Sequence, residues 1–319
     1  MDARSFRRFR DLAAKAQPAE AVRALAAGCA NGAGSADDRL ALAAALAHAA
    51  FAAPERLVET YDAAAAGWRG ADVQGPALAF ADLPPAAISD ALWAEVSAIF
   101  DVNTAPISPS DVTTRTAALG AVLDESLAPR FAAAAATYPG VSEAAAHGLP
   151  PRFTLAALAA CPNGSLGRTF HDLIVDNGFD LEVLDRDALG LDGLPAPLGY
   201  LNARILQCHD LWHIVGGYQT TALHEVAVSA FQAAQFGHGY SAFFLAVVAA
   251  RAVDEPGFFS LIMEVILSAW RHGRETPPLI AIPWAEVWSE PTEAVRARCG
   301  VKPFASPYPA DLFEQLKAA

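Results

Sequence analysis

The chain has 319 residues, 54% of them hydrophobic and 18% charged, so a packed core is possible and intrinsic disorder is not the default expectation. Its 22 basic and 35 acidic side chains leave a net charge of −13, which disfavours binding to the phosphate backbone of a nucleic acid. The four cysteines are widely spaced and form no CxxC pair, so neither a disulfide framework nor a zinc ribbon is predicted.

Residues 1–70 are predicted to form an N-terminal helical region of three or four helices. Ser35 precedes a stretch rich in alanine and leucine, 37–52, and is expected to be the N-cap of a helix that is buried on most sides. Pro54 begins the next helix at a first-turn position, where the missing N–H of proline is tolerated.

Residues 71–149 are predicted to hold a linker and extra helices. Glycine and proline are frequent in 69–90, which is typical of a long loop. Further helices are expected over 89–100 and over 112–136, the second with a break at Pro129, since proline disrupts a helix interior.

Residues 150–305 are predicted to form the metal-binding helical core, followed by a C-terminal tail over 306–319. Helical periodicity is sustained, with glycines as stop signals, over five segments: 166–177, 199–215, 220–236, 240–252 and 257–272. No segment alternates as a strand does, and alanine, the best helix former, is abundant. The sequence therefore predicts an all-α fold, a multi-helix bundle.

Two histidines and two carboxylates form a candidate metal site. Successive residues of an α-helix turn by about 100°, so the imidazoles of His209 and His213 point the same way, one turn apart. Asp210 lies beside them, and Glu225 falls early on the helix that follows Gly216-Gly217. Two histidines at this spacing can chelate one cation, as in HExxH zinc enzymes, where a downstream glutamate is the third ligand. These four residues are predicted to be metal ligands and catalytic residues on a helical hairpin.

The remaining polar residues near this motif allow several interpretations. Asp210 replaces the glutamate of HExxH, and its shorter side chain is expected to ligate the metal rather than to activate a water. His224 is interpreted as an extra ligand or, in preference, as an exposed or supporting residue, since it points about 100° away from Glu225. His171-Asp172 lacks a second histidine four residues on and is interpreted as a helix-surface pair.

Aromatic residues are frequent in and after the metal motif and suit two interpretations. They could line a long apolar cavity for a lipid chain, although ordinary core packing explains most of them individually. The residues are Trp212, Phe231, Phe236, Phe243, Phe244, Phe258, Phe259 and Trp270.

The N-terminus carries four arginines, at positions 4, 7, 8 and 10, but no apolar run follows them, so no secretory signal is predicted. They predict a solvated helix end, with contact to a membrane surface as the alternative. No stretch approaches the roughly 18 apolar residues of a membrane span. The predicted location is the cytoplasm, with peripheral contact to the inner membrane as the alternative.

The candidate site follows a fixed pattern: His209-Asp210-x-x-His213, then eleven residues, then Glu225. This pattern matches, in residue type and spacing, the hallmark of the ubiquinone (coenzyme Q) biosynthesis protein 4 family. The chain resembles that family over about 150–302. A faint likeness extends over 40–68. His224 departs from the glycine that this family usually has before the glutamate. Further matches are the turn Pro162 to Gly167, the segment Asp176 to Phe179, Arg204, Trp270, Gly273, Pro278-Leu279, Trp284 and Arg296.

The resemblance implies a bound divalent cation, with zinc as the first expectation and iron or manganese as the alternatives, beside a pocket for a prenyl lipid. It implies oxidative decarboxylation, with hydroxylation at the same carbon, of a polyprenylated ring derived from 4-hydroxybenzoate. The alternative is a non-catalytic, prenyl-lipid-binding organiser of the other ubiquinone biosynthesis enzymes, and a divergent metal-dependent hydrolase is a third hypothesis. Expected partners are the prenylated intermediate, those enzymes and a second copy of the chain.

Overall fold

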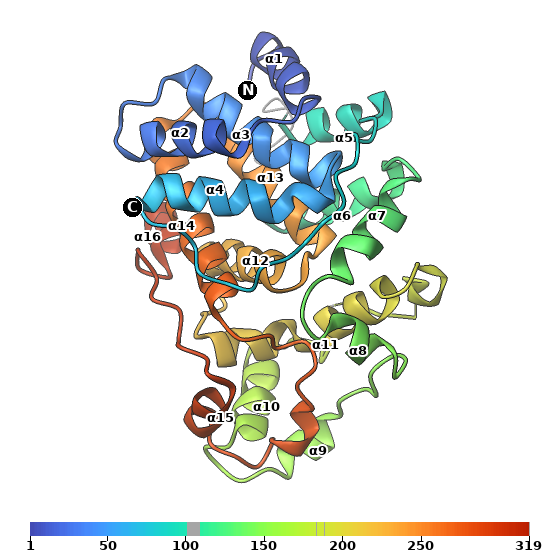
Figure 1. Cartoon of the computed structure of the whole chain (residues 1–319). Coiled ribbons are helices and arrows are strands. Elements are labelled where there is room, and N and C mark those ends of the chain that lie inside the picture. The colour runs from blue at the N-terminus through green and yellow to red at the C-terminus, as the bar shows by residue number, and fades with distance from the viewer. Residues whose placement is uncertain (101–108, 183, 188, 319) are drawn as a thin grey trace.

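The computed structural model describes residues 1–100, 109–182, 184–187 and 189–318, and over these residues the protein is all-helical (Figure 1). Within this part of the chain there is no β-strand, and a single isolated bridge pairs Ser165 with Pro291. The predicted all-α, multi-helix class is confirmed.

The N-terminal region contains four α-helices, as predicted, and α3 lies at its centre. Every residue of α3 from Leu42 onward is buried, because the helix packs against α1, α2, α4 and α13. Ser35 is its N-cap and forms a capping box with Asp38, in which each side chain accepts from the other residue's backbone N–H. The helices are α1 (Ala3–Ala13), α2 (Ala19–Ala30), α3 (Ala36–Phe51) and, after a 3-10 turn at Pro54–Arg56, α4 (Leu57–Arg69).

The segment 70–89 has no regular structure, as predicted, and runs along the outside of the helices (Figure 1). Helices α5 (Asp90–Phe100), α6 (Pro109–Ala118) and α7 (Leu127–Ala135) follow. The prediction of a break at Pro129 is wrong, because the helix ends earlier, after the 3-10 turn Leu119–Val122. Pro129 lies in the first turn of α7, where a backbone N–H has no intrahelical partner to lose.

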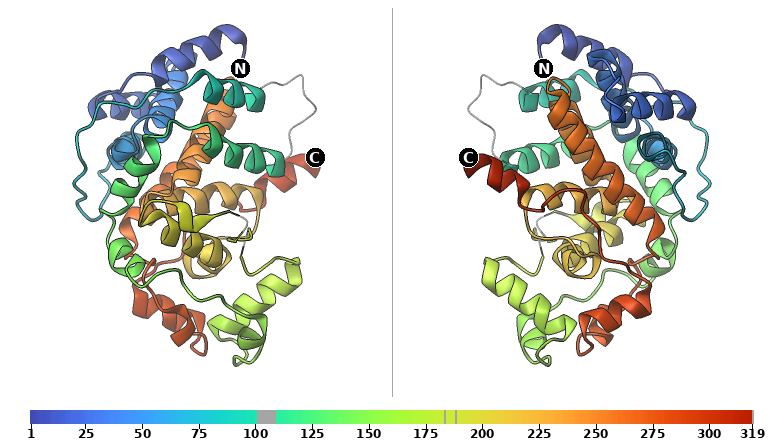
Figure 2. Two further views of the ribbon diagram at one scale, coloured as in Figure 1. Left: turned by 90° about the vertical axis from the view of Figure 1, so that its right-hand side faces the viewer. Right: turned by 90° about the vertical axis from the view of Figure 1, so that its left-hand side faces the viewer.

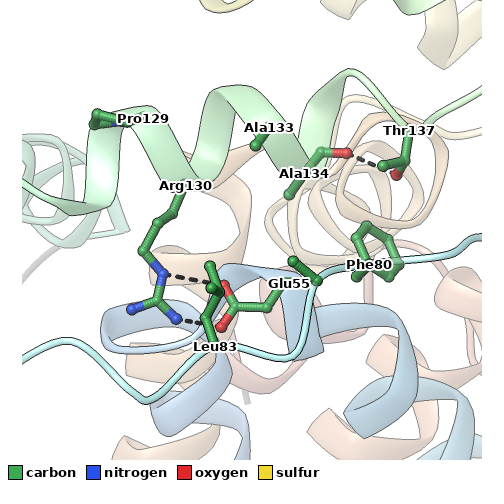
Figure 3. Close-up of a pocket in the computed structure, with 9 residues that line it drawn as sticks. Glu55, Phe80, Leu83, Pro129, Arg130, Ala133, Ala134 and Thr137 are labelled. Carbon is green, nitrogen blue, oxygen red and sulfur yellow. Dashed lines mark hydrogen bonds and ion pairs between the residues drawn. The ribbon is translucent and has the colours of Figure 1, made fainter.

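A buried ion pair joins α7 to the N-terminal region at the rim of a cavity of about 260 Å³ (Figure 3). The Arg130 guanidinium contacts the Glu55 carboxylate, and its Nη1 donates to the Pro84 carbonyl oxygen at 3.0 Å. The side chains of Arg130 and Glu55 are 11% and 6% exposed. One cation thus fixes α7, the 3-10 turn and the outer segment to one another.

The C-terminal half carries the longest helices and a lobe at the end of the molecule opposite α1 (Figures 1 and 2). Helix α14 crosses the molecule and packs closely on α12, where Gly273 allows the contact because a Cβ there would lie 2.7 Å from the Phe231 carbonyl oxygen. The lobe contains α9, α10 and α15. The helices are α8 (Val141–Ala145), α9 (Leu155–Ala159), α10 (Leu166–Asn177), α11 (Leu198–Gly216), α12 (Ala222–Phe236), α13 (Gly239–Ala252), α14 (Pro256–Glu275), α15 (Thr292–Cys299) and α16 (Leu312–Ala318).

The five long helices predicted for this half are present, but four short ones were not predicted. These are α8, α9, α15 and α16, the last of which lies in the segment interpreted as a C-terminal tail. Of the eight aromatic residues in and after the metal motif, all but Phe258 are buried in the core, which favours the core-packing interpretation. Among the described residues, no helix is long and apolar enough to cross a bilayer.

Candidate metal centre

A glycine turn brings α12 back towards α11 and so creates the site. Gly217 takes a left-handed conformation (φ 79°), and the N–H of Tyr218 donates to the His213 carbonyl oxygen at 2.8 Å, which closes the end of α11. A side chain at Gly217 is excluded twice, by this backbone conformation and by Pro303, which a Cβ would approach to 2.8 Å. Helix α12 then begins at Ala222, and Glu225 falls in its first turn.

The four predicted site residues lie together. Glu225 Oε1 is 3.3 Å from His213 Nε2, and Glu225 Oε2 is 3.5 Å from His209 Nε2. The two imidazole centroids are 5.0 Å apart. Asp210 Oδ1 lies 3.1 Å from His209 Nδ1, and ligand atoms of His209, Asp210 and His213 fall within 4.8 Å of one another. The juxtaposition expected from helical spacing and the hairpin is therefore present.

His213 is oriented as a metal-binding histidine would be. Its Nδ1 lies 3.0 Å from the Gln219 carbonyl oxygen, and because a carbonyl only accepts, Nδ1 must carry the proton. In the neutral imidazole the other nitrogen, Nε2, bears a lone pair; this atom is buried, has no hydrogen-bond partner and lies 3.3 Å from Glu225 Oε1. A buried lone pair directed at a carboxylate lacks a positive partner, and a cation between them would supply it. The donor set thus fits a divalent metal.

His224 lies outside the cluster and is buried, so the interpretation of it as an exposed residue is wrong and that of a supporting residue remains. It is 3% exposed, and its Nδ1 accepts from the N–H of Gln219 at 2.8 Å. The backbone of Gln219 is therefore held by His224 at its N–H, while its carbonyl oxygen accepts from His213. His224 supports His213 through the backbone of this one residue.

Neighbouring charges set the protonation of the cluster. Burial alone would lower the pKa of His209, but the Asp210 hydrogen bond and the Glu225 carboxylate outweigh it and raise that pKa. Burial alone would raise the pKa of Glu225, but the imidazoles of His213 and His209 outweigh it and lower that pKa. Glu225 therefore stays ionised, and because its side chain is 44% exposed, the cluster is open to solvent on that side.

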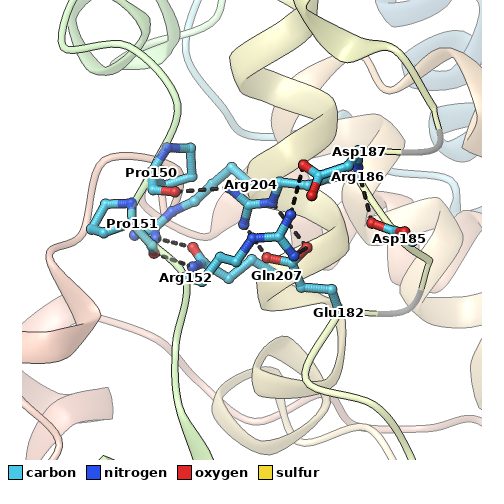
Figure 4. A network of polar contacts seen from close by, with 9 residues as sticks. All are labelled: Pro150, Pro151, Arg152, Glu182, Asp185, Arg186, Asp187, Arg204 and Gln207. Atoms are coloured by element: carbon cyan, nitrogen blue, oxygen red, sulfur yellow. Dashed lines mark hydrogen bonds and ion pairs between the residues drawn. The ribbon is translucent and has the colours of Figure 1, made fainter.

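A polar network anchors α11 one turn before the cluster, and sequence reasoning missed most of it (Figure 4). Gln207 Nε2 donates to the Pro151 carbonyl oxygen at 2.6 Å, and Arg204 Nη1 donates to Gln207 Oε1 at 2.7 Å. Arg186 pairs with Glu182 and donates to the Pro150 carbonyl oxygen at 2.8 Å. Only Arg204 carried a signal, through its family match.

The second His-Asp pair lies outside the cluster. His171 Nδ1 is 2.9 Å from Asp172 Oδ1, and Arg168 Nε donates to the same oxygen at 2.9 Å. His171-Asp172 is half-buried on α10, outside the cluster, which makes it a matched control for His209-Asp210.

Comparison with known proteins gives a consistent family. Residues 151–305 match the family described as "Coenzyme Q (ubiquinone) biosynthesis protein Coq4". The ubiquinone biosynthesis protein COQ4 homolog, mitochondrial, of Rattus norvegicus is 29% identical over 151 residues, 47% of this chain and 55% of that protein. The ubiquinone biosynthesis protein COQ4, mitochondrial, of Eremothecium gossypii is 26% identical over 154 residues, 48% of this chain and 46% of that protein.

The chain thus spans about half the length of the curated relatives it matches. Their names say "mitochondrial", so the predicted cytoplasmic location gains no support from them. Among solved structures, a putative ubiquinone biosynthesis protein from Nostoc punctiforme matches 66% of this chain and 95% of its own, with a TM-score of 0.47 and 23% identity. The match over 151–305 contains all four residues of the candidate metal centre, so this part of the chain is similar to the Coq4 family of ubiquinone biosynthesis proteins.

Proposed function

We propose that this chain is a metal-dependent enzyme of ubiquinone biosynthesis that oxidatively decarboxylates a polyprenylated ring derived from 4-hydroxybenzoate. The observation that carries the proposal is the buried, unpaired His213 Nε2 facing Glu225 inside the segment that matches the family. The ring–carboxylate bond would break, carbon dioxide would leave and oxygen would be added at the same carbon. One dioxygen balances this step when the phenol itself supplies the electrons, with a ring quinone and water as the other products.

The residues of the cluster have distinct roles in this proposal. His209, His213 and Glu225 would hold the cation, with Asp210 as a further ligand and as the group that orients His209. Two imidazoles with carboxylates suit zinc, iron or manganese, and the bound cation would polarise a carboxylate or phenol oxygen as a Lewis acid. The exposed side of Glu225 is the side from which the ring would enter.

A lipid-binding organiser is the second candidate, and the surface of the lobe favours it. Large apolar side chains are exposed in the segment 149–194, which suits contact with a lipid or a partner enzyme. In this candidate the metal is structural and the intermediate is bound without turnover. The exposed residues are Leu149, Leu155, Val175, Phe179, Leu184, Leu189 and Leu194.

Metal content and turnover separate the candidates. Elemental analysis of the purified protein should find about one divalent ion per chain, lost in His213→Ala and kept in His171→Ala. Loss of the carboxylate from a prenylated hydroxybenzoate under air, dependent on metal and on His213, supports the enzyme. Tight binding without turnover supports the organiser, and turnover of simple esters or phosphates supports a hydrolase. Equal metal content in all variants would refute the site.

A further inference from the structure

Besides His224 Nε2, two buried N–H groups near the metal cluster have no acceptor. They are the indole Nε1 of Trp212 on α11 and the amide Nε2 of Gln232 on α12. The two residues are 0% and 2% exposed. Folded proteins pair nearly all buried donors, because an unpaired one destabilises the fold. Two unpaired donors close to a candidate active site therefore point to a ligand acceptor.

Gln232 lies on the face of α12 that looks towards α11. Glu225, Ser229, Gln232 and Phe236 are four, three and four residues apart, so they fall within an arc of about 60° on one helix face. Glu225 contacts the two imidazoles at one end of this face, and the Phe236 ring lies 4.7 Å from the Trp212 ring at the other. Gln232, between these two contacts, must face α11 next to the cluster.

Trp212 flanks the metal-binding face of α11. It stands three residues after His209 and directly before His213, so its side chain leaves the helix about 60° from the direction of His209. Its ring is fully buried against Phe236, one helical turn beyond Gln232. The two unpaired donors therefore lie on facing sides of the same contact between α11 and α12.

The Gln232 amide is held with its donor end free. Gln232 Oε1 accepts from Ser241 Oγ at 3.4 Å, and that hydroxyl lies 2.8 Å from His238 Nδ1. Burial lowers the pKa of His238 to about 3, and the His209 imidazole adds to this effect, so His238 is neutral and near the cluster. Because Oε1 is engaged, Nε2 is left to donate elsewhere.

We propose that Trp212 Nε1 and Gln232 Nε2 form an acceptor subsite that binds a carboxylate oxygen of an aromatic acid beside the metal cluster. The inference rests on the proposed function for the identity of the acid. An anionic oxygen suits two neutral, dry donors because charge-assisted hydrogen bonds are the strongest available to them. Trp212 and Gln232 are positioning residues here, since they orient the carboxylate rather than ligate the metal.

The test measures binding and stability together. The probe is a short-chain prenylated 4-hydroxybenzoate, titrated calorimetrically into metal-loaded protein, with the prenylated phenol that lacks the carboxylate as the matched ligand. Gln232→Leu and Trp212→Phe should each weaken binding of the acid about tenfold or more and leave binding of the phenol unchanged. Metal content should stay at the wild-type value. The melting temperature of Gln232→Leu should stay equal or rise, because the change removes an unpaired buried donor and keeps the side-chain volume.

Three results would overturn the subsite: unchanged affinity of both variants for the acid, no binding of the acid by the wild-type protein, or a clear loss of thermal stability in Gln232→Leu. The last would show that the donors are paired within the fold, for example through a buried water. Binding is measured without turnover, so the outcome is separable from that of the proposed function. Selective weakening in a protein that never releases carbon dioxide would sustain the subsite and refute the decarboxylase.

Discussion

The substitution Gln235→Leu should destabilise the protein strongly, although Gln235 lies far from any reacting group. Its Nε2 donates to the carbonyl oxygens of Gly273 at 2.6 Å and Thr276 at 2.7 Å, and its Oε1 accepts from the N–H of Leu279 at 3.1 Å. The Gly273 carbonyl has no helical alternative, because the residue four positions on is Pro277, which lacks an N–H. One side chain thus satisfies three backbone groups where α14 ends.

The size of the effect follows from these three groups. Leucine resembles glutamine in volume and helix propensity, so α12 itself should be little affected. Each buried backbone group left without a partner costs about 1–3 kcal/mol, and Gln235 is only 6% exposed, so water gives little relief. We expect a loss of about 3 kcal/mol or more, which lowers the melting temperature by roughly 6 °C or more.

Thermal and chemical denaturation of Gln235→Leu beside Gln232→Leu check this reasoning. Both glutamines are buried on α12, three residues apart, and both changes are identical in chemistry. The expected order is a large loss at Gln235 and little or none at Gln232. A loss under about 1 kcal/mol at Gln235, the net value of a single ordinary hydrogen bond, would refute the view that its three bonds hold the end of α14.

Three further predictions follow from other groups. Loss of either partner of the Glu55–Arg130 pair should cost about 3–5 kcal/mol, whereas joint replacement by Leu and Met should recover most of it, as a double-mutant cycle would show. The pKa of His238 falls from 6.5 in the unfolded chain to about 3 in the folded protein. Its contribution to the free energy of unfolding is therefore complete above pH 6.5 and falls by up to about 1.4 kcal/mol per pH unit as the pH drops toward 3. His238→Gln should flatten that slope in denaturation curves measured at a series of pH values. Because the pKa of His209 is raised, protons should compete with zinc for this imidazole already above pH 6.5, and the affinity for zinc should fall as the pH is lowered further. Titration with a chelating dye at about pH 8 and about pH 6 measures this fall. Equal affinities at the two pH values would contradict the prediction.

The long helices could be predicted because their signals are local. Ser35 caps α3 through its own neighbours, and Gly178 and Gly217 end α10 and α11 in left-handed conformations that glycine adopts without strain. The five-residue helices α8 and α9 are too short to show a 3.6-residue period. Pro129 was misjudged because a proline in a first turn and one in a helix interior look alike until the helix start is known.

The geometry of the candidate metal cluster could also be predicted, since two histidines one turn apart and a short hairpin leave Glu225 little freedom. What surrounds the cluster could not. The Gln219 peptide orients His213 with a backbone carbonyl, which any residue type supplies, so no sequence pattern marks it. The anchor of α11 depends on Arg186 and Gln207 meeting carbonyls at 150–151, more than 30 positions away in the chain.

Gln232 and Gln235 show most clearly where sequence reasoning ends. Both are glutamines on one helix, both are buried, and nothing in their local sequence separates them. At Gln235 the backbone at the end of α14 and just after it supplies partners for both polar atoms, so the side chain stabilises the fold. At Gln232 the neighbouring helix supplies a partner for the oxygen only, and the unpaired nitrogen is left for a ligand. The difference between a structural and a functional glutamine is therefore a property of the tertiary neighbours, and identical substitutions at the two positions measure it directly.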